Sequence, residues 1–290
     1  MKEKIIEKVN RKSMIIRPSG RSTDFISPSF GYGCLLNCTY CYMKRHKPEG
    51  LHIANNTNDI LTAINNHAYF ESTVDKPNQT DDTFITYDIS CNEDFALHSR
   101  KYHEWKKIFT FFKEHPIAKA SLATKIVPSH FLDFNPNRKV RIRFSLMPET
   151  IAEILEPDAS SIVSRIVAIE EFLAFGYDVH INFSPVIIYD GWEKDYRDLF
   201  RQIDYAIFNK ALVKSEVIFL THNVDKHNYN INNKLNGEHL IWNPSIQEDK
   251  VSQYGGKNIR YKYQLKREYI NKFLEIHNEI IPWNKIRYIF

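Results

Sequence analysis

Residues 30–48 read FGYGCLLNCTYCYMKRHKP and place three of the chain's four cysteines within eight residues. Cys34, Cys38 and Cys41 follow a C-x3-C-x2-C spacing, directly after a strand predicted within residues 25–32. Thiolates are the usual protein ligands of zinc and of iron–sulfur clusters. Structural zinc sites close with four protein ligands, whereas this triplet would leave one iron of a cubane cluster open to a small molecule. A zinc knuckle, or three thiols without a metal, are the alternatives that the spacing leaves open.

Beyond this stretch, short segments rich in β-branched and aromatic residues alternate with amphipathic helical patterns. Strands are predicted over residues 84–90, 118–124, 140–146, 179–188 and 216–221, and helices over residues 58–70, 95–112, 161–175, 192–208 and 264–280. Alternating β and α units favour a parallel sheet with helices outside. About six units fit before residue 225, fewer than the eight of a complete TIM barrel. The predicted fold class is therefore α/β, a partial TIM-type (β/α)6 barrel with a C-terminal β-hairpin and helix.

This fold divides the chain into three predicted parts. Residues 1–24 form an N-terminal extension, residues 25–225 form the partial barrel, and residues 226–290 form the hairpin and helix, which pack on the barrel and bind substrate. In parallel α/β folds the chemistry lies at the carboxyl ends of the strands. The residues that end each predicted strand are therefore the site candidates.

Composition excludes several other classes of protein. The 290 residues contain 43% hydrophobic residues, enough for a full core, but no apolar run approaches the ~20 residues that span a bilayer. The first residues lack the apolar stretch of a secretion signal. Lysine and arginine number 39 against 35 acidic residues, and this net charge of +4 is compatible with an anionic partner without indicating one. Four cysteines are too few for a disulfide scaffold, which predicts a reducing compartment, the cytoplasm.

The cysteine spacing resembles that of the radical S-adenosylmethionine (radical SAM) superfamily, in which an aromatic residue, here Tyr40, also precedes the third cysteine. The resemblance implies that Cys34, Cys38 and Cys41 hold a 4Fe-4S cluster, whose fourth iron binds the amino and carboxylate groups of SAM. It also implies reductive cleavage of SAM to a 5′-deoxyadenosyl radical.

A series of short matches, from about residue 30 to the C-terminus, resembles the spore photoproduct lyase family. These are GCLLNCTYCY at 33–42, Cys91 followed by Asp94, ATK at 123–125, RIRFS at 141–145, EPDASS at 156–161, SPVIIYDGWEKDY at 184–196 and QYGGK at 253–257. The resemblance implies a lyase that repairs 5-thyminyl-5,6-dihydrothymine, the spore photoproduct, in DNA. Hydrogen is abstracted from C6 of this thymine dimer, the linking carbon–carbon bond breaks, and hydrogen is returned.

The same resemblance implies roles for single residues. Cys91, at the end of the strand over residues 84–90, donates hydrogen to the thymine radical, and Tyr40 and Tyr42 carry the radical back. A lone cysteine is otherwise most often a small buried hydrophobe. Burial does not oppose the assigned role, because hydrogen donation needs no low thiol pKa. Contacts to SAM are expected from three residues near strand ends: Lys125, Ser145 and Asp94.

DNA binding needs cations along a groove and an element that reaches the lesion. Candidate cations lie at Lys44, Arg45 and Lys47, within residues 138–143 and within residues 250–267. The turn at 253–257 is flanked by strand-like sequence and predicts a β-hairpin. The resemblance implies that this hairpin wedges into the duplex. Its expected substrate contacts are Gln253, which stands where the family is expected to have arginine, Tyr254 and Lys257.

The prediction is therefore a radical SAM lyase of thymine dimers. One alternative is a radical SAM enzyme that acts on another damaged nucleotide or a peptide, and a second is a non-enzymatic, metal-stabilised nucleic-acid-binding module. Cys91, Tyr40 and Tyr42 together favour the lyase, because a binding module needs no hydrogen donor. The expected partners are damaged DNA and a flavodoxin- or ferredoxin-type electron donor. No membrane partner is expected, and the chain is expected to be a monomer.

Overall fold

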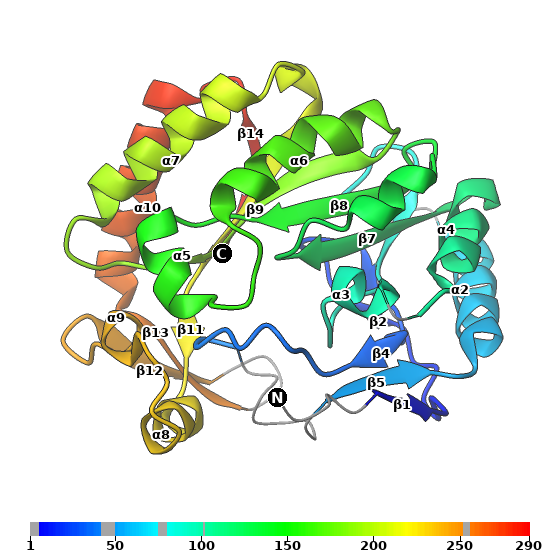
Figure 1. The fold of residues 1–290 in the computed structure, drawn as a ribbon, viewed down its shortest axis with the longest axis horizontal. Coiled ribbons are helices and arrows are strands. Elements are labelled where there is room, and N and C mark those ends of the chain that lie inside the picture. Colours follow the sequence, from blue (N-terminus) through cyan, green and yellow to red (C-terminus); the bar gives the residue numbers. More distant parts are fainter. Residues whose placement is uncertain (1–5, 42–49, 75–79, 101, 252–255) are drawn as a thin grey trace. The chain divides into compact units, whose positions relative to one another are not determined.

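The computed structural model describes residues 6–41, 50–74, 80–100, 102–251 and 256–290 (Figure 1). The chain forms two compact units, each made of segments that are distant in sequence. The first unit comprises Met1–Leu35, Lys47–Phe144 and Ala168–His180, and the second comprises Leu36–His46, Ser145–Val167 and Ile181–Phe290.

The first unit is built on a largely parallel sheet. Its strands are hydrogen-bonded in the order β8 (Val140–Ser145), β7 (Ala118–Thr124), β6 (Ile85–Asp88), β3 (Phe25–Ile26) and β2 (Arg17–Pro18). Strands β3, β6, β7 and β8 run parallel, and β2 pairs antiparallel with β3. Nearly every residue of β7 and β8 is buried, as expected for parallel strands covered on both faces.

A smaller sheet and several helices complete the first unit. The sheet has the order β1 (Ile6–Val9), β5 (Leu51–Ala54), β4 (Gly31–Tyr32). The helices are α2 (Thr57–Ser72), α3 (Phe95–Ser99), α4 (Trp105–Glu114) and the 3-10 turn η1 (Ser129–Asp133). Helices α2 and α4 contact each other and both pack against β7 (Figure 1). Apolar residues at helical spacing, such as Ile60 and Ile64 on α2, supply the buried faces.

The second unit contains the strand order β14 (Lys285–Ile289), β10 (Lys214–Phe219), β9 (Asp178–Val186), in which β10 and β14 run parallel. Its helices include α5 (Glu149–Leu155), α7 (Trp192–Ala206) and α10 (Tyr263–Ile280), and α6 (Ile162–Ala174) begins in this unit. Helices α7 and α10 lie side by side (Figure 1), where the Phe273 ring packs against the rings of Tyr196 and Phe200.

The predicted hairpin is present in the second unit. Strands β12 (Gln247–Val251) and β13 (Lys257–Tyr261) pair antiparallel, with Val251 opposite Lys257, and β11 (Thr221–His222) pairs with β13. The short helices α8 (Val224–Asn232) and α9 (Glu238–Ile241) and the 3-10 turn η2 (Lys210–Leu212) lie in the same unit. Gln253 and Tyr254 lie outside the described residues.

Two expectations about secondary structure are wrong in detail, and one strand lies where none was expected. The helix predicted over residues 95–112 is divided into α3 and α4, and between them the buried Tyr102 donates its hydroxyl to the Ala54 carbonyl at 2.9 Å. The strand predicted within residues 25–32 is two strands in different sheets, separated at Pro28, which has no N–H to donate. Strand β14 was not expected after the last helix.

Among the described residues, no helix has the length and hydropathy needed to cross a membrane.

Candidate active site

The loop that carries Cys38 and Cys41 is a tight turn in the second unit. Asn37 has a left-handed φ of 53°, and its side-chain amide donates to Asp158 Oδ2 at 2.5 Å. The Cys41 N–H donates to the Cys38 carbonyl at 3.1 Å. This bond closes the four-residue turn and fixes the backbone between the two thiols, as a C-x2-C metal loop requires.

Thr39 anchors this turn through three hydrogen bonds to separate segments. Its N–H donates to the Leu155 carbonyl at 2.9 Å, and its hydroxyl donates to the Asn236 carbonyl at 2.8 Å. The Asn230 side chain donates to the Thr39 carbonyl at 2.9 Å. Thr39 is buried, so these partners also satisfy polar groups that water does not reach.

A buried polar network connects Tyr40 with Ser145. The Tyr40 hydroxyl donates to Glu156 Oε1, and Arg165 forms an ion pair with Glu156 Oε2 at 2.7 Å. Arg165 also donates to the Ser145 carbonyl at 2.8 Å. Burial, reinforced by the negative charge of Glu156, raises the pKa of Tyr40 well above its usual value. Tyr40 therefore keeps its phenolic hydrogen at neutral pH.

Glu156 and Arg165 were not assigned any role from the sequence. Glu156 is the first residue of the EPDASS stretch, one of the short matches to the family. That match is the sequence feature from which a role for Glu156 could have been inferred. Arg165 lies within the predicted helix over residues 161–175, and an arginine in such a helix is expected to be exposed to solvent. The structure buries it to 1% exposure, because its guanidinium group is occupied by Glu156 and by carbonyl oxygens.

Replacing Arg165 with methionine is expected to destabilise the protein by about 3–5 kcal/mol, because it leaves the Glu156 carboxylate buried without its ion pair. Chemical denaturation measures this change in unfolding free energy. The matched control is the double variant Arg165→Met with Glu156→Gln, which leaves no unpaired charge and should recover most of the loss. Losses that simply add in the double variant would contradict the buried ion pair.

Within the first unit, backbone pairing joins the residue before Cys34 to the residues that follow Cys91. Gly33, which precedes Cys34, donates its N–H to the Asn92 carbonyl at 3.1 Å and bridges to Glu93. Gly33 has a φ of 91°, and a Cβ atom there would lie 2.3 Å from the Gly50 carbonyl oxygen. Only glycine fits this conformation and approach without strain. The segment that leads into the cysteine triplet thus lies against the loop that follows β6.

The surroundings of Cys91 keep its thiol protonated. Cys91 is half-buried, and burial together with the Asp88 carboxylate raises its pKa to about 11, although Arg17 and Arg143 act in the opposite direction. Arg143 forms an ion pair with Asp88 at 2.7 Å, and Asp88 also accepts the Ser90 N–H at 2.8 Å. These contacts fix the end of β6, where Cys91 follows.

Asp94 holds the neighbouring strand end in place. Its carboxylate accepts hydrogen bonds from the Lys125 N–H at 2.9 Å, the Thr124 hydroxyl at 2.9 Å and the Leu97 N–H at 3.2 Å. Asp94 also caps helix α3. These contacts position Lys125, which is half-buried directly after β7. Contact between Asp94 and SAM stays a prediction.

Ser145 ends β8 and is buried in the second unit, where its hydroxyl accepts from the Asn182 side chain at 3.3 Å. Cys34 belongs to the first unit, whereas Cys38 and Cys41 belong to the second. Within the described ranges, no three histidine, cysteine or acidic side chains are gathered as metal ligands would be. A shared cluster on the three cysteines therefore stays a prediction.

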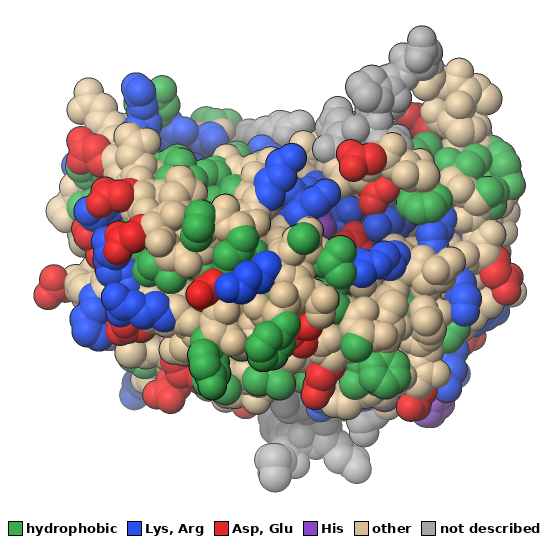
Figure 2. Space-filling view, turned by 90° about the horizontal axis from the view of Figure 1, so that it is seen from above, with side chains coloured by type: hydrophobic (Ala, Val, Ile, Leu, Met, Phe, Trp, Pro, Cys, Tyr) green, Lys and Arg blue, Asp and Glu red, His purple; other side chains and the backbone are tan. Residues whose placement is uncertain are grey.

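The candidate radical carrier Tyr42 lies outside the described residues. The candidate DNA contacts fall into three groups, of which the first, Lys44, Arg45 and Lys47, also lies outside the described residues. Lys257 is exposed on β13. Arg141 and Arg143 are 2% and 3% exposed and are held in ion pairs with acidic residues, so these two arginines are not surface cations. Figure 2 shows Lys and Arg side chains interspersed with Asp and Glu on the face that it presents, in keeping with the low net charge.

The fold of the chain is that of known partial α/β barrels. It superposes with a TM-score of 0.88 on a solved double mutant of spore photoproduct lyase with bound AdoMet and dinucleoside spore photoproduct, at 18% identity, over 98% of this chain and 82% of that chain. A second structure, spore photoproduct lyase complexed with dinucleoside spore photoproduct, gives a TM-score of 0.87 at 19% identity with the same coverage. The predicted fold class is confirmed.

The sequence profile of the spore photoproduct lyase family matches residues 2–290, and the chain belongs to this family. It is 27% identical to the spore photoproduct lyase of Bacillus subtilis (strain 168) over 201 residues, which cover 68% of this chain and 56% of that protein. It is 26% identical to that of Geobacillus sp. (strain Y412MC61) over 206 residues, covering 67% and 58%. The chain thus spans little more than half the length of these curated relatives.

Proposed function

We propose that this chain is a radical SAM lyase that repairs 5-thyminyl-5,6-dihydrothymine, the spore photoproduct, in DNA. The observation that carries the proposal is the match of the spore photoproduct lyase family to residues 2–290. The solved structures of similar fold support the substrate class, because both structures described above hold dinucleoside spore photoproduct and one of them also holds AdoMet, that is, SAM.

The cysteines supply suitable donors for an iron–sulfur cluster. None of the four cysteines is part of a disulfide, and a single turn carries Cys38 and Cys41. Three thiolates would hold a 4Fe-4S cluster: Cys34, Cys38 and Cys41. When bound, the cluster and SAM would supply the radical chemistry that abstracts hydrogen from C6 of the lesion. Lys125 and Ser145 bind SAM, and Asp94 positions Lys125 through its backbone N–H.

Cys91 returns a hydrogen atom to the thymine radical left by scission of the linking bond. With a pKa of about 11, the thiol retains its hydrogen at neutral pH. The S–H bond breaks homolytically, a C–H bond forms on thymine, and Cys91 is left as a thiyl radical. A hydrogen atom then passes from the tyrosines, Tyr40 and Tyr42, to sulfur, and the tyrosyl radical left behind carries the radical back toward 5′-deoxyadenosine. The Glu156 carboxylate, which accepts from the Tyr40 hydroxyl, holds this hydrogen in place before the transfer.

The remaining partners follow from this chemistry. A flavodoxin- or ferredoxin-type protein delivers the electron that SAM cleavage consumes. The β12–β13 hairpin contacts damaged DNA through Gln253, Tyr254 and Lys257, of which Lys257 lies exposed at the start of β13. The protein acts as a monomer in the cytoplasm.

The test is anaerobic turnover of a defined spore photoproduct dinucleotide with dithionite and SAM. We expect conversion of the lesion to two unmodified thymines and formation of 5′-deoxyadenosine, both measured by liquid chromatography and mass spectrometry. The control is the isomeric cyclobutane thymine dimer, which should remain intact because it lacks the single methylene-linked bond. Formation of 5′-deoxyadenosine without lesion repair would favour a radical SAM enzyme with another substrate.

A further inference from the structure

A cavity of about 250 Å³ lies in the first unit beside the Cys91 loop. One side is formed by four residues of the N-terminal segment: Arg11, Ser13, Ile15 and Arg17. The other side includes Ser29 and Asn92, and Asn92 directly follows Cys91 in the chain. The volume equals that of roughly eight water molecules in the liquid, which gives room for a phosphate group with attached sugar atoms.

The N-terminal segment presents its arginines to this cavity because it is extended. Alternate residues of an extended chain point to the same face, which accounts for the lining by residues 11, 13, 15 and 17. The Asn56 side chain fixes one end by accepting from the Arg11 N–H at 2.9 Å and donating to the Arg11 carbonyl at 3.1 Å. At the other end, Arg17 pairs with Ile26 in the β2–β3 ladder. Both arginines are therefore positioned by backbone hydrogen bonds.

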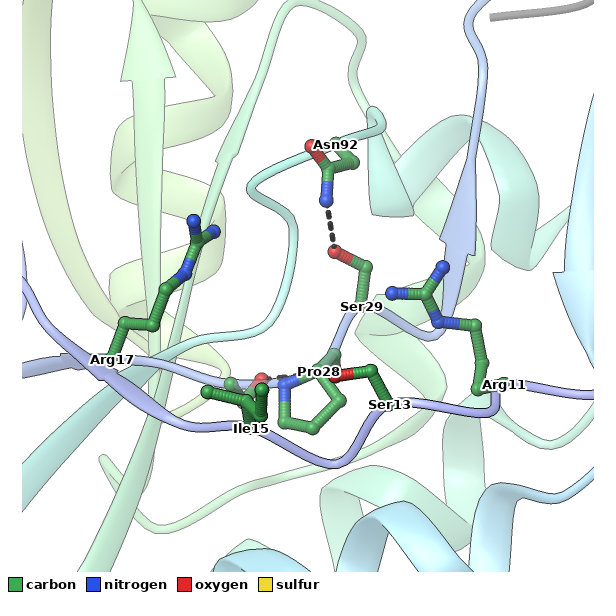
Figure 3. A pocket seen from close by; sticks show the side chains of 8 residues that line it. Arg11, Ser13, Ile15, Arg17, Pro28, Ser29 and Asn92 are labelled. Carbon is green, nitrogen blue, oxygen red and sulfur yellow. Dashed lines mark hydrogen bonds between the residues drawn. The ribbon is translucent and has the colours of Figure 1, made fainter. Parts of the chain in front are cut away.

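The cavity offers cations and hydrogen-bond donors for an anion. Figure 3 shows Arg11 and Arg17 flanking it, with both guanidinium groups on the side where Asn92 lies. The Arg11 guanidinium lies 5.9 Å from the centroid of the Tyr32 ring, and its buried Nε has no hydrogen-bond partner among the residues that the structure describes. The described lining residues include no carboxylate. Leaving a buried guanidinium donor without an acceptor costs free energy, and an anion bound in the cavity would supply the acceptor.

We propose that this arginine pocket, formed by Arg11, Ser13, Arg17, Ser29 and Asn92, binds a backbone phosphate of the DNA strand that carries the lesion. The proposal rests on the proposed function and deepens it. Arginine is suited to phosphate because its planar fork donates two parallel hydrogen bonds. Arg17 also acts electrostatically on Cys91, so a phosphate bound there would hold the strand next to the hydrogen donor.

The test measures the affinity of the reconstituted holoenzyme, with SAM, for two probes. One is a short single-stranded oligonucleotide that contains the lesion, and the other is the lesion dinucleoside, which has no phosphate. Arg11→Gln and Arg17→Gln should each weaken oligonucleotide binding by about 5- to 10-fold. Each should also reduce the slope of log K against log salt by about 0.7, the value for one contact to a single strand. Dinucleoside affinity should stay unchanged.

The matched control is Lys12→Gln, which removes a charge from the exposed, opposite face of the same segment. Its effect on oligonucleotide binding should stay below about twofold, as for a screened surface charge. An equal effect of Lys12→Gln and the arginine variants would overturn the pocket in favour of general charge attraction. Equal losses on the dinucleoside would also overturn it, because that probe carries no phosphate. Binding of inorganic phosphate without any effect of the variants on the oligonucleotide would identify a free-anion site instead.

An undamaged oligonucleotide of the same length separates this proposal from the proposed function. If the protein fails to repair the lesion, the proposed lyase activity is wrong. The arginine pocket still stands if the two variants weaken binding of the undamaged strand and lower its salt slope. If repair proceeds normally and neither variant changes oligonucleotide affinity, the pocket is wrong and the lyase activity stands.

Discussion

Cys91→Ala is expected to consume the lesion but to release an altered product. In the proposed mechanism the thiol takes no part in cluster binding, SAM cleavage or the first hydrogen abstraction, so these steps should proceed. The thymine radical left after bond scission then lacks its hydrogen donor. The sulfur dioxide radical anion derived from dithionite is an available trap, and a thymine sulfinate should replace part of the repaired thymine. Mass spectrometry of the products detects this change, which a rate measurement would miss.

Cys91→Ser provides the matched control for side-chain size and polarity. An O–H bond is stronger than an S–H bond, so serine should give the same altered product as alanine. A purely structural role of Cys91 makes a different prediction. Alanine would then remove one partly buried sulfur, cost about 1–2 kcal/mol of unfolding free energy, and leave thymine as the sole product. Unaltered thymine from both variants would remove Cys91 from the mechanism.

Replacing any one cysteine of the triplet is expected to abolish the iron–sulfur centre and all turnover. The wild-type protein should be brown after anaerobic reconstitution, with about four irons per chain and absorbance that bleaches with dithionite. Cys34→Ala, Cys38→Ala and Cys41→Ala should each lose this colour and form no 5′-deoxyadenosine. The reason is that three thiolates are the only protein ligands assigned to the cluster. Iron analysis and visible absorption spectra measure the result.

The fourth cysteine supplies the control for this experiment. Cys91→Ala removes the same number of sulfur atoms but should retain the iron content and the colour of the wild type. Stoichiometric zinc with no uptake of iron would contradict the radical mechanism. A triplet variant that keeps four irons and forms 5′-deoxyadenosine would show that the cluster ligands are assigned wrongly.

Much of this architecture could be predicted because regular structure leaves a periodic signal. Strand β7 matches its predicted range, and α7 begins at the predicted residue 192 and ends two residues before the predicted end. The break between β3 and β4 has a weaker signal, a single proline at position 28. The cysteine triplet and Cys91 could be located because their spacing and their order along the chain are short-range properties.

The polar contacts of the site could not be predicted in the same way. Glu156 and Arg165 belong to the candidate site because Glu156 accepts a hydrogen bond from Tyr40 and pairs with Arg165. Tyr40 lies more than a hundred residues away in the sequence, so the sequence alone does not show this contact. Similarly, residues 11, 13, 15 and 17 form one face only because Asn56 and β3 hold the segment extended. Neither pattern is hydrophobic, so neither contributes to the periodicity from which helices and strands are inferred.

The raised pKa of Cys91 also affects how readily its sulfur is alkylated or oxidised. Alkylating agents and peroxides attack the thiolate, and the thiolate fraction at pH 7 falls to about one in ten thousand when the pKa is about 11. Hydrogen-atom donation uses the neutral S–H group and loses nothing from this suppression. In the proposed mechanism, the same partial burial that keeps the hydrogen on Cys91 for donation also shields its sulfur from the two-electron reactions of thiolates.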